Sequence, residues 1–261
     1  MAKDLHRNLL RTRMVINLMR YLALLVLCAA LPALAAPLPA FNASYTVHKG
    51  NLLLGEMRRT LSKQDDGRQV FETETRSGGL VALFVKDLII ERSEWEYHAG
   101  RIRSLHYSYR KTGGKKERRL DQLFDWERGV VNGDGSEHGS NKIPITAGTL
   151  DKLVYQLALM TDLKQGKTEL AYTLIDDDQI KIYRFRVAGE ETLTTPLGAL
   201  KTLKIERIMD ADSKRRTTLW CAPSLDYLLV RLDQQENGAD EFSALIKTVE
   251  GLRAPASPNS P

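Results

Sequence analysis

The chain has 261 residues, of which 43% are hydrophobic and 27% charged, with nine Pro, eighteen Gly and two Cys. This composition is that of a globular protein and excludes a collagen-like or wholly disordered chain. Two Cys are too few for a disulfide-rich scaffold or a four-thiolate zinc site.

The formal net charge of +5 comes mostly from the first 35 residues. That segment holds five of the 38 basic residues and one of the 33 acidic ones, which leaves 33 basic and 32 acidic residues for the rest. A nucleic-acid surface needs clustered Lys and Arg. The densest basic run, Arg110–Arg119, is better explained as the exposed tip of a hairpin. We therefore expect no nucleic-acid partner.

The N-terminus has the pattern of a secretory signal peptide over residues 1–35. An apolar run of eleven residues, Tyr21–Leu31, follows Arg20, and small residues then precede an expected cleavage between Ala35 and Ala36. A membrane-spanning helix needs about 20 apolar residues, so this run is too short to be an anchor. We predict a periplasmic protein that does not span the membrane once it is processed.

Two details of this leader affect processing. The basic front end is long, so translation could start at Met1, Met14 or Met19, and the sequence leaves the three open. Acylation of Cys28 would need a small residue just before it, but Leu27 stands there. We therefore expect no lipoprotein.

Short alternating stretches dominate the chain after residue 36. Turn residues such as Asp66-Gly67 and Gly113-Gly114 separate them, and such pairs favour hairpins because they tolerate positive φ. The expected strands are 41–47, 52–63, 68–75, 88–97, 101–110, 168–175, 179–187, 200–209, 215–221, 227–236 and 241–249. This spacing predicts a mainly β domain over 36–252, with about 10–12 short antiparallel strands curved into a β-barrel or sandwich. The tail 253–261 is expected to be disordered.

One segment, near residues 149–163, breaks the strand period. Its apolar residues share one helical face: Leu150, Leu153, Val154, Leu157 and Met160. Thr149 can cap the start, Asp151 suits the positive end of the helix dipole, and Gly166 can end the helix. We predict one amphipathic helix packed on the sheet.

The C-terminal half carries a distinctive set of motifs. They are Thr195–Glu206, Arg215–Trp220, Ala222-Pro223 and Tyr227–Arg231, and Phe41–Gly55 and Leu150–Leu157 add to the pattern. This pattern resembles the secreted bacterial family called domain of unknown function 3108, over nearly the whole chain after the leader. The resemblance implies an exported, mostly antiparallel β protein of Gram-negative bacteria, and it implies no activity. Leu229 departs from the pattern, which has Pro there.

The residues that carry this resemblance are interpreted as structural. They are Tyr45, Gly55, Thr195, Pro196, Gly198, Trp220 and Pro223. Pro196 fixes φ at the start of a turn, and Gly198 permits a left-handed step out of it. Trp220 is expected to pack across from Leu203 and Ile205.

Motifs for catalysis or metal binding were sought along the chain. Asn132–His138 lacks the closing Glu of a calcium loop, and Asp176–Asp178 fits a turn between strands. His48, His98, His106 and His138 lack the spacing of a zinc site, and Ser136 does not sit in a nucleophile motif. Cys221 is interpreted as a buried, inert thiol. Glu72 and Glu74 share a strand face, but the catalytic carboxylates of glycosidases come from separate strands, so the two do not define such a pair. We assign no catalytic residue, no metal and no cofactor.

Three functions remain open. We favour a non-enzymatic binding or chaperone-like module of the cell envelope, whose curved sheet and helix hold a lipid or another apolar ligand, with Gly78–Val85 as an apolar flap. The alternative is a periplasmic interaction or structural protein with an envelope protein as partner. A hydrolase acting on envelope glycans or esters ranks third, and oligomeric state is not predicted.

Overall fold

The computed structural model describes residues 37–79, 82, 86–114, 116–135, 137, 139–210 and 212–252. The expected signal peptide with Ala35 and Ala36, most of the Gly78–Val85 flap, Ser136, His138 and the tail 253–261 lie outside these ranges. The strands are β1 (Phe41–Lys49), β2 (Leu52–Lys63), β3 (Gln69–Ser77), β4 (Leu88–His98), β5 (Arg101–Thr112), β6 (Arg118–Asp125), β7 (Val130–Gly135), β8 (Gly139–Pro144), β9 (Leu150–Asp151), β10 (Glu169–Asp176), β11 (Gln179–Thr195), β12 (Gly198–Ile208), β13 (Arg215–Ala222), β14 (Leu228–Glu236) and β15 (Ala239–Glu250).

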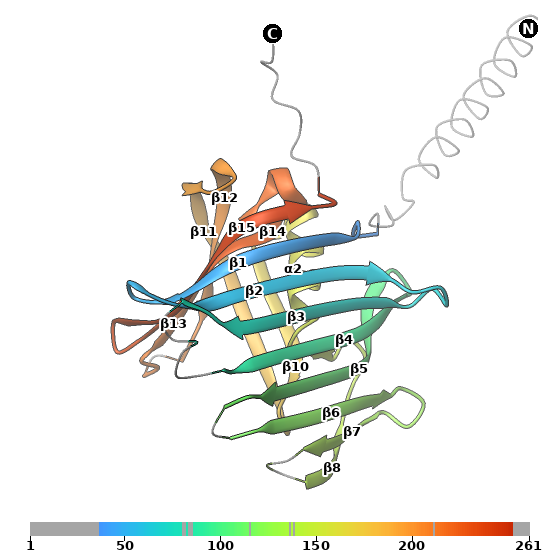
Figure 1. Cartoon of the computed structure of the whole chain (residues 1–261). Coiled ribbons are helices and arrows are strands. Elements are labelled where there is room, and N and C mark those ends of the chain that lie inside the picture. The colour runs from blue at the N-terminus through green and yellow to red at the C-terminus, as the bar shows by residue number, and fades with distance from the viewer. Residues whose placement is uncertain are drawn as a thin grey trace, which may run out of the picture. The chain divides into compact units, whose positions relative to one another are not determined.

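All these strands belong to one curved sheet (Figure 1). Its order is β8-β7-β6-β5-β4-β3-β2-β1-β15-β14-β13-β12-β11-β10-β9, so the first and last strands pair in the middle and the edges are β8 and β9. Every pair is antiparallel except β9 with β10. Neighbouring strands therefore pair in sequence as in an up-and-down barrel, but β8 and β9 do not pair with each other, so the barrel is not closed.

The predicted fold class, mainly β with a curved antiparallel sheet and one helix, is confirmed. The described residues hold fifteen strands, more than the 10–12 expected. The difference lies mainly in the stretch from Arg118 to Asp151, where β6, β7, β8 and β9 form without the clean alternation that marks the longer strands.

The predicted amphipathic helix is α2 (Tyr155–Lys164), which starts later than expected. Leu150 and Asp151 form β9 instead, and the Asp151 carboxylate accepts hydrogen bonds from the backbone N–H groups of Leu153 and Val154, at 2.9 and 2.8 Å. The pairing of β9 with β10 holds these residues extended, so the helix cannot begin at Thr149. Gly166 follows the helix with a φ of +78°, as a left-handed stop requires.

The core lies between α2 and the inner face of the sheet, which is the face turned toward α2. Alternate residues of β1, namely Phe41, Ala43, Tyr45 and Val47, are buried there. The helix contributes four buried side chains, Leu157, Leu159, Met160 and Leu163, and contacts β5, β10 and β14. Strands from both ends of the sheet therefore enclose the helix.

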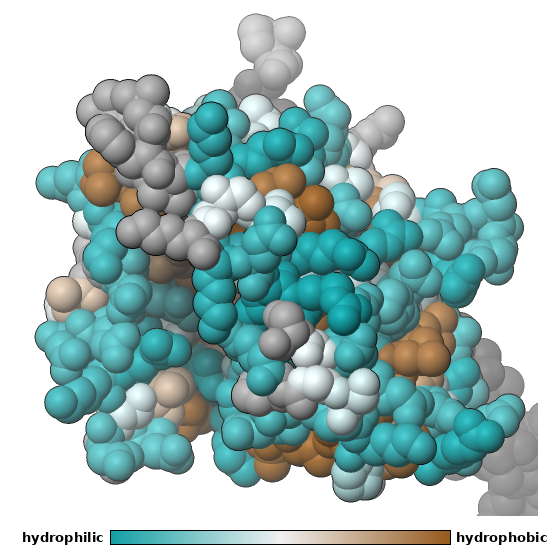
Figure 2. Space-filling view, turned by 60° about the horizontal axis from the view of Figure 1, so that its bottom comes forward, coloured by the Kyte–Doolittle hydropathy of each residue, from teal (hydrophilic) through white to brown (hydrophobic). Residues whose placement is uncertain are grey.

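The side of the molecule drawn in Figure 2 is mainly hydrophilic, with apolar side chains in small separate patches. Along the described residues, none of the helices has the length and apolar character that crossing a membrane would require.

Candidate functional site

Two residues of the predicted signature, Tyr45 and Gly55, lie on β1 and β2. Tyr45 is 1% exposed, and its hydroxyl donates a hydrogen bond to the backbone oxygen of Leu229 at 2.7 Å. Burial raises the pKa of Tyr45 to about 12. A Cβ at Gly55 would stand 2.0 Å from the backbone oxygen of Arg76, so β2 and β3 can approach here only with glycine. Both residues hold strands in place.

Three signature residues form the turn between β11 and β12, and a fourth starts a short helix. Thr195 Oγ1 accepts a hydrogen bond from Leu197 N at 3.1 Å and donates one to Gly198 O at 2.8 Å. Pro196 precedes Leu197 in this turn, and Gly198 has a φ of +97°. Pro223 is the first residue of a 3-10 helix over Pro223–Leu225. Their contacts are local to turns.

Trp220 differs from its predicted packing. It pairs with Lys204 in the ladder between β13 and β12, and so points to the face opposite Leu203 and Ile205. The ring remains 6% exposed because Lys204 Nζ lies 5.8 Å from its centroid and its Nε1–H donates to Glu191 Oε2 at 3.0 Å. The expectation of contact with Leu203 and Ile205 is therefore wrong.

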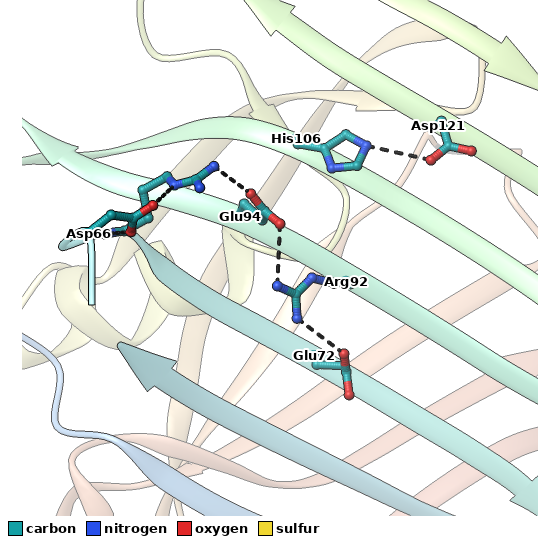
Figure 3. Close-up of polar contacts among 7 residues, drawn as sticks. Asp66, Glu72, Arg92, Glu94, His106 and Asp121 are labelled. Atoms are coloured by element: carbon teal, nitrogen blue, oxygen red, sulfur yellow. Dashed lines mark hydrogen bonds and ion pairs between the residues drawn. The ribbon is translucent and has the colours of Figure 1, made fainter. Parts of the chain in front are cut away.

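Charged side chains on the outer face of β3–β6 pair with one another (Figure 3). Ion pairs of 2.6–3.5 Å join Asp66 to Arg68, Arg68 to Glu94, Glu94 to Arg92, Arg92 to Glu72, and His106 to Asp121. Glu74 pairs with Arg76 at 2.5 Å, so Glu72 and Glu74 each face a cation. Exposed pairs of this kind contribute about 0–1 kcal/mol each. This face is therefore a solvated surface with its charges balanced.

A buried acid ties the edge strand β9 to strands β4 and β5, which it does not neighbour in the hydrogen-bond ladder. Asp151, on β9, is 0% exposed, and its Oδ2 accepts hydrogen bonds from Ser93 Oγ on β4 and Ser104 Oγ on β5, at 2.6 and 2.8 Å. Ser104 Oγ also accepts a hydrogen bond from Asp151 N at 2.9 Å. Burial raises the pKa of Asp151, and its hydrogen bonds from Ser93, Val154 and Ser104 oppose that rise. We call Asp151, Ser93 and Ser104 the seam.

Polar residues cross the inner face in one row beside the seam. Register pairs place Arg59 on β2 opposite Thr73 on β3, and Thr73 opposite Glu91 on β4. Above this row, Gln156 of α2 and Lys152 just before it face the sheet: Arg59 Nη1 donates to Gln156 Oε1 at 2.8 Å, and Lys152 Nζ lies 3.7 Å from Glu91 Oε1. We call Arg59, Thr73, Glu91, Lys152 and Gln156 the inner cluster.

Arg59 is the unusual member of this cluster. It is 6% exposed, and none of the described carboxylates lies within 4 Å of its guanidinium. Its Nε has no hydrogen-bond partner, and neither does the Oγ1 of Thr73, which is 7% exposed. A buried charge without a partner is costly, and native proteins rarely leave buried polar atoms unpaired. These atoms therefore fit a polar group that comes from outside the chain.

Aromatic rings surround the inner cluster. Lys152 Nζ lies 5.7 Å from the Tyr107 ring and 5.0 Å from the Tyr109 ring, and the Arg59 guanidinium carbon lies 5.3 Å from the Tyr45 ring. Burial raises the pKa of Glu91, and the ammonium of Lys152 opposes the rise. The cluster thus combines cations, hydrogen-bonding groups and aromatic surface.

The opposite wall comes from the other end of the sheet. Tyr155 of α2 packs edge-on against Tyr183 and stacks on Phe185, and the Arg207 guanidinium carbon lies 3.4 Å from the Tyr183 ring centroid. Burial raises the pKa of Tyr155, while the guanidinium groups of Arg207 and Arg59 oppose the rise.

Arg59 was not among the predicted site residues, although its place in β2 carries a signal. Met57, Arg59 and Leu61 alternate along β2, and the two flanking residues are 5% and 1% exposed. A charged residue in the apolar register of a strand marks an inward-facing charge. That pattern could have identified Arg59 before the structure.

The residues considered for catalysis or metal binding are placed apart. Cys221 is buried, and burial raises the pKa of its thiol, which makes it a poor nucleophile. Asp176 is in an ion pair with Lys181 at 2.8 Å, and Asp177 is in one with Arg118 at 2.9 Å. Among the described residues, no three His, Cys, Asp or Glu side chains are gathered as a metal site needs.

Comparison with known proteins identifies the family and the fold. No curated protein matches the chain. A solved structure of a β-barrel-like protein of domain of unknown function DUF1849 from Brucella abortus is similar, with a TM-score of 0.55 and 11% identity, over 82% of this chain and 98% of that one. The model of the family described as protein of unknown function (DUF3108) matches residues 44–240. Because that match covers more than half of the sequence, the chain belongs to the DUF3108 family.

Proposed function

We propose that this protein is an exported, non-enzymatic binding module of the cell envelope, and that its inner cluster holds the acidic group of a small amphiphilic ligand. The observation that carries the proposal is Arg59, a buried cation with no carboxylate partner within 4 Å among the described residues. A carboxylate or phosphate would accept hydrogen bonds from the guanidinium and neutralise its charge.

The neighbours of Arg59 support such a ligand. Thr73 Oγ1 can donate a further hydrogen bond, because it has no partner in the protein. Lys152 adds a second cation, but Glu91 lies 3.7 Å from it and balances part of its charge. An acidic group is therefore favoured on the Arg59 side of the cluster.

The apolar part of the ligand has limited space. Leu153, Val154 and Leu157 fill the region between helix and sheet, with exposures of 0–1%, so we do not propose a wide hollow barrel. The half-buried rings of Tyr109 and Tyr183 offer apolar surface beside the cluster. Each buried methylene would contribute about 0.8 kcal/mol, so a short chain against these rings suffices for binding.

Export is part of the proposal and has its own test. The leader over residues 1–35 supports periplasmic localisation through a cleaved signal peptide. N-terminal sequencing of the protein from the periplasmic fraction should begin at Ala36. A protein that stays in the cytoplasm with its leader intact would overturn the export part.

Ligand binding is tested by native mass spectrometry and by titration with a fluorescent fatty acid. We expect a co-purifying amphiphile or saturable uptake of the probe by the wild-type protein. Arg59→Gln should weaken binding about tenfold or more, because it removes a charged hydrogen bond worth about 1.5–3 kcal/mol. Arg58→Gln is the matched control, because Arg58 is the neighbouring arginine on the exposed face of the same strand.

The folded state of the variants is checked by thermal unfolding. Arg59→Gln should fold, because a buried charge without an ion-pair partner contributes little to stability. Arg59→Lys keeps the charge and should retain part of the affinity. Absence of both a co-purifying ligand and probe uptake in the wild type would overturn the proposal, as would equal binding by Arg59→Gln and Arg58→Gln.

A further inference from the structure

The sheet opens between β12 and β13. These strands pair only where Leu203–Glu206 face Thr218–Cys221. Beyond that point β12 continues to Ile208 along β11, and β13 begins at Arg215 along β14. The two strands therefore diverge and leave a cleft of about 700 Å³ between them, which we call the split.

The split reaches both faces of the sheet. Arg207 pairs with the buried Phe185 and so belongs to the inner face, as does Thr217, which lies two residues before the buried Leu219. Trp220 lines the split from the outer face. A ligand seated here would lie in the plane of the sheet, where a strand pair would otherwise run.

The lining of the split is rich in cations. Its charged residues are Arg186, Lys204, Arg207, Arg215 and Arg216 against Glu206, Asp210 and Asp233. Arg186 pairs with Glu206 at 2.8 Å, and Arg215 pairs with Glu236 outside the lining at 3.4 Å. No described carboxylate lies within 4 Å of the guanidinium groups of Arg207 and Arg216. Lys204 pairs with Glu191 outside the lining at 3.7 Å, and the Arg207 guanidinium packs on the Tyr183 ring. Arg207 and Arg216 therefore have no ion-pair partner among the described residues.

An unpaired buried hydroxyl points to the same place. Thr217 is 7% exposed, it lines the split, and its Oγ1 has no hydrogen-bond partner. Buried hydroxyls in native proteins nearly always have a partner. This missing hydrogen bond is an observation separate from the surplus of cations in the lining, and a hydrogen-bond acceptor in the split could supply it.

We propose that the split binds a phosphate group, with Arg207 and Arg216 supplying guanidinium donors and Thr217 a hydroxyl donor. Phosphate presents several acceptor oxygens and suits the forked donors of arginine. The group can come from a soluble phosphate or from a lipid headgroup. This site is separate from the inner cluster and does not depend on the proposed function.

The first experiment uses inorganic phosphate as the probe. Isothermal titration at constant ionic strength should show saturable binding to the wild-type protein, at least tenfold weaker binding to Arg216→Gln and Arg207→Gln, and weaker binding to Thr217→Val. Arg184→Gln is the matched control, because Arg184 is exposed on β11 and does not line the split. Arg59→Gln should also bind phosphate as the wild type does, which separates this site from the inner cluster.

The second experiment identifies the source of the phosphate. Vesicles of phosphatidylcholine with phosphatidic acid are compared with pure phosphatidylcholine vesicles in a flotation assay. Binding of the phosphatidic acid vesicles that Arg216→Gln abolishes supports a lipid headgroup, and binding of inorganic phosphate alone supports a soluble ligand. The proposal is overturned if the wild type binds neither probe, or if Arg184→Gln weakens binding as much as Arg216→Gln.

Discussion

The sheet is interrupted at two places, which differ in whether their buried polar groups have hydrogen-bond partners within the protein. At the seam, the edge strand β9, which pairs only with β10, meets β4 and β5, and each side-chain oxygen of Asp151 accepts two hydrogen bonds. At the split, β12 and β13 diverge, Thr217 Oγ1 has no hydrogen-bond partner among the described groups, and Arg207 and Arg216 have no described carboxylate within 4 Å.

This difference separates architecture from binding. A buried polar network that is complete within the protein holds a structure together. A buried polar group that lacks a partner lowers stability, and a ligand can supply what is missing. By this criterion the seam is structural, whereas the split and Arg59 of the inner cluster have the features that we propose for binding sites.

The largest expected effect is at the seam. Asp151→Ala should lower the free energy of unfolding by about 3–5 kcal/mol, because it leaves the donors of Ser93, Ser104, Leu153 and Val154 without an acceptor, each worth about 1–3 kcal/mol before relaxation. Urea denaturation followed by circular dichroism measures the change.

The matched control for this variant is Asp65→Ala, in the exposed turn between β2 and β3. A surface substitution there should change stability by less than about 0.5 kcal/mol. If Asp151→Ala cost no more than Asp65→Ala, the seam would not close the sheet and the comparison would fail.

The sequence was a good guide to parts with strong periodicity. Alternation in β1 and β11 and the turn at Asp176–Asp178 identified strands and a hairpin correctly. The start of α2 could not be predicted, because the pairing of Leu150 and Asp151 with β10 depends on residues more than twenty positions away. Local propensity therefore gave way to a long-range contact.

The candidate sites were harder to predict than the fold. Arg59 carried a signal, an arginine in the apolar register between Met57 and Leu61. The split carried none, because it depends on where the ladder between β12 and β13 ends. Trp220 was assigned to the wrong face for a related reason: its partner is set by a register that sequence spacing alone does not fix.

The second prediction concerns pH at the seam. Because the pKa of Asp151 is raised in the folded state, the folded protein holds this proton more strongly than the unfolded chain does. This contribution to the free energy of unfolding is present below pH 3.8, the ordinary pKa of the Asp side chain. It is lost as the pH rises through the raised pKa of Asp151 in the folded protein. The free energy of unfolding of wild type minus that of Asp151→Asn should therefore fall as pH rises across this window.

Taking the difference removes the contributions of other groups that titrate in both proteins. Glu91 cancels only in part, because burial also raises its pKa and its charge interacts with that of Asp151. Lys152 and the Tyr107 hydroxyl face the same region, and burial raises the pKa of Tyr107 further above the acidic range of this experiment. A difference that stayed flat or rose with pH would show that hydrogen bonds outweigh burial at Asp151.

The smallest expected effect on stability is at the split. Thr217→Val replaces a hydroxyl that has no partner with a methyl group of similar size, so the free energy of unfolding should stay within about 0.5 kcal/mol of wild type or rise slightly. Ser93→Ala at the seam is the comparison, because its hydroxyl donates to Asp151 at 2.6 Å and its loss should cost about 1–3 kcal/mol. The same urea titration measures both variants. Equal losses would mean that the Thr217 hydroxyl is satisfied by solvent in the folded protein, and the split would then no longer differ from the seam in the way that assigns it to a ligand.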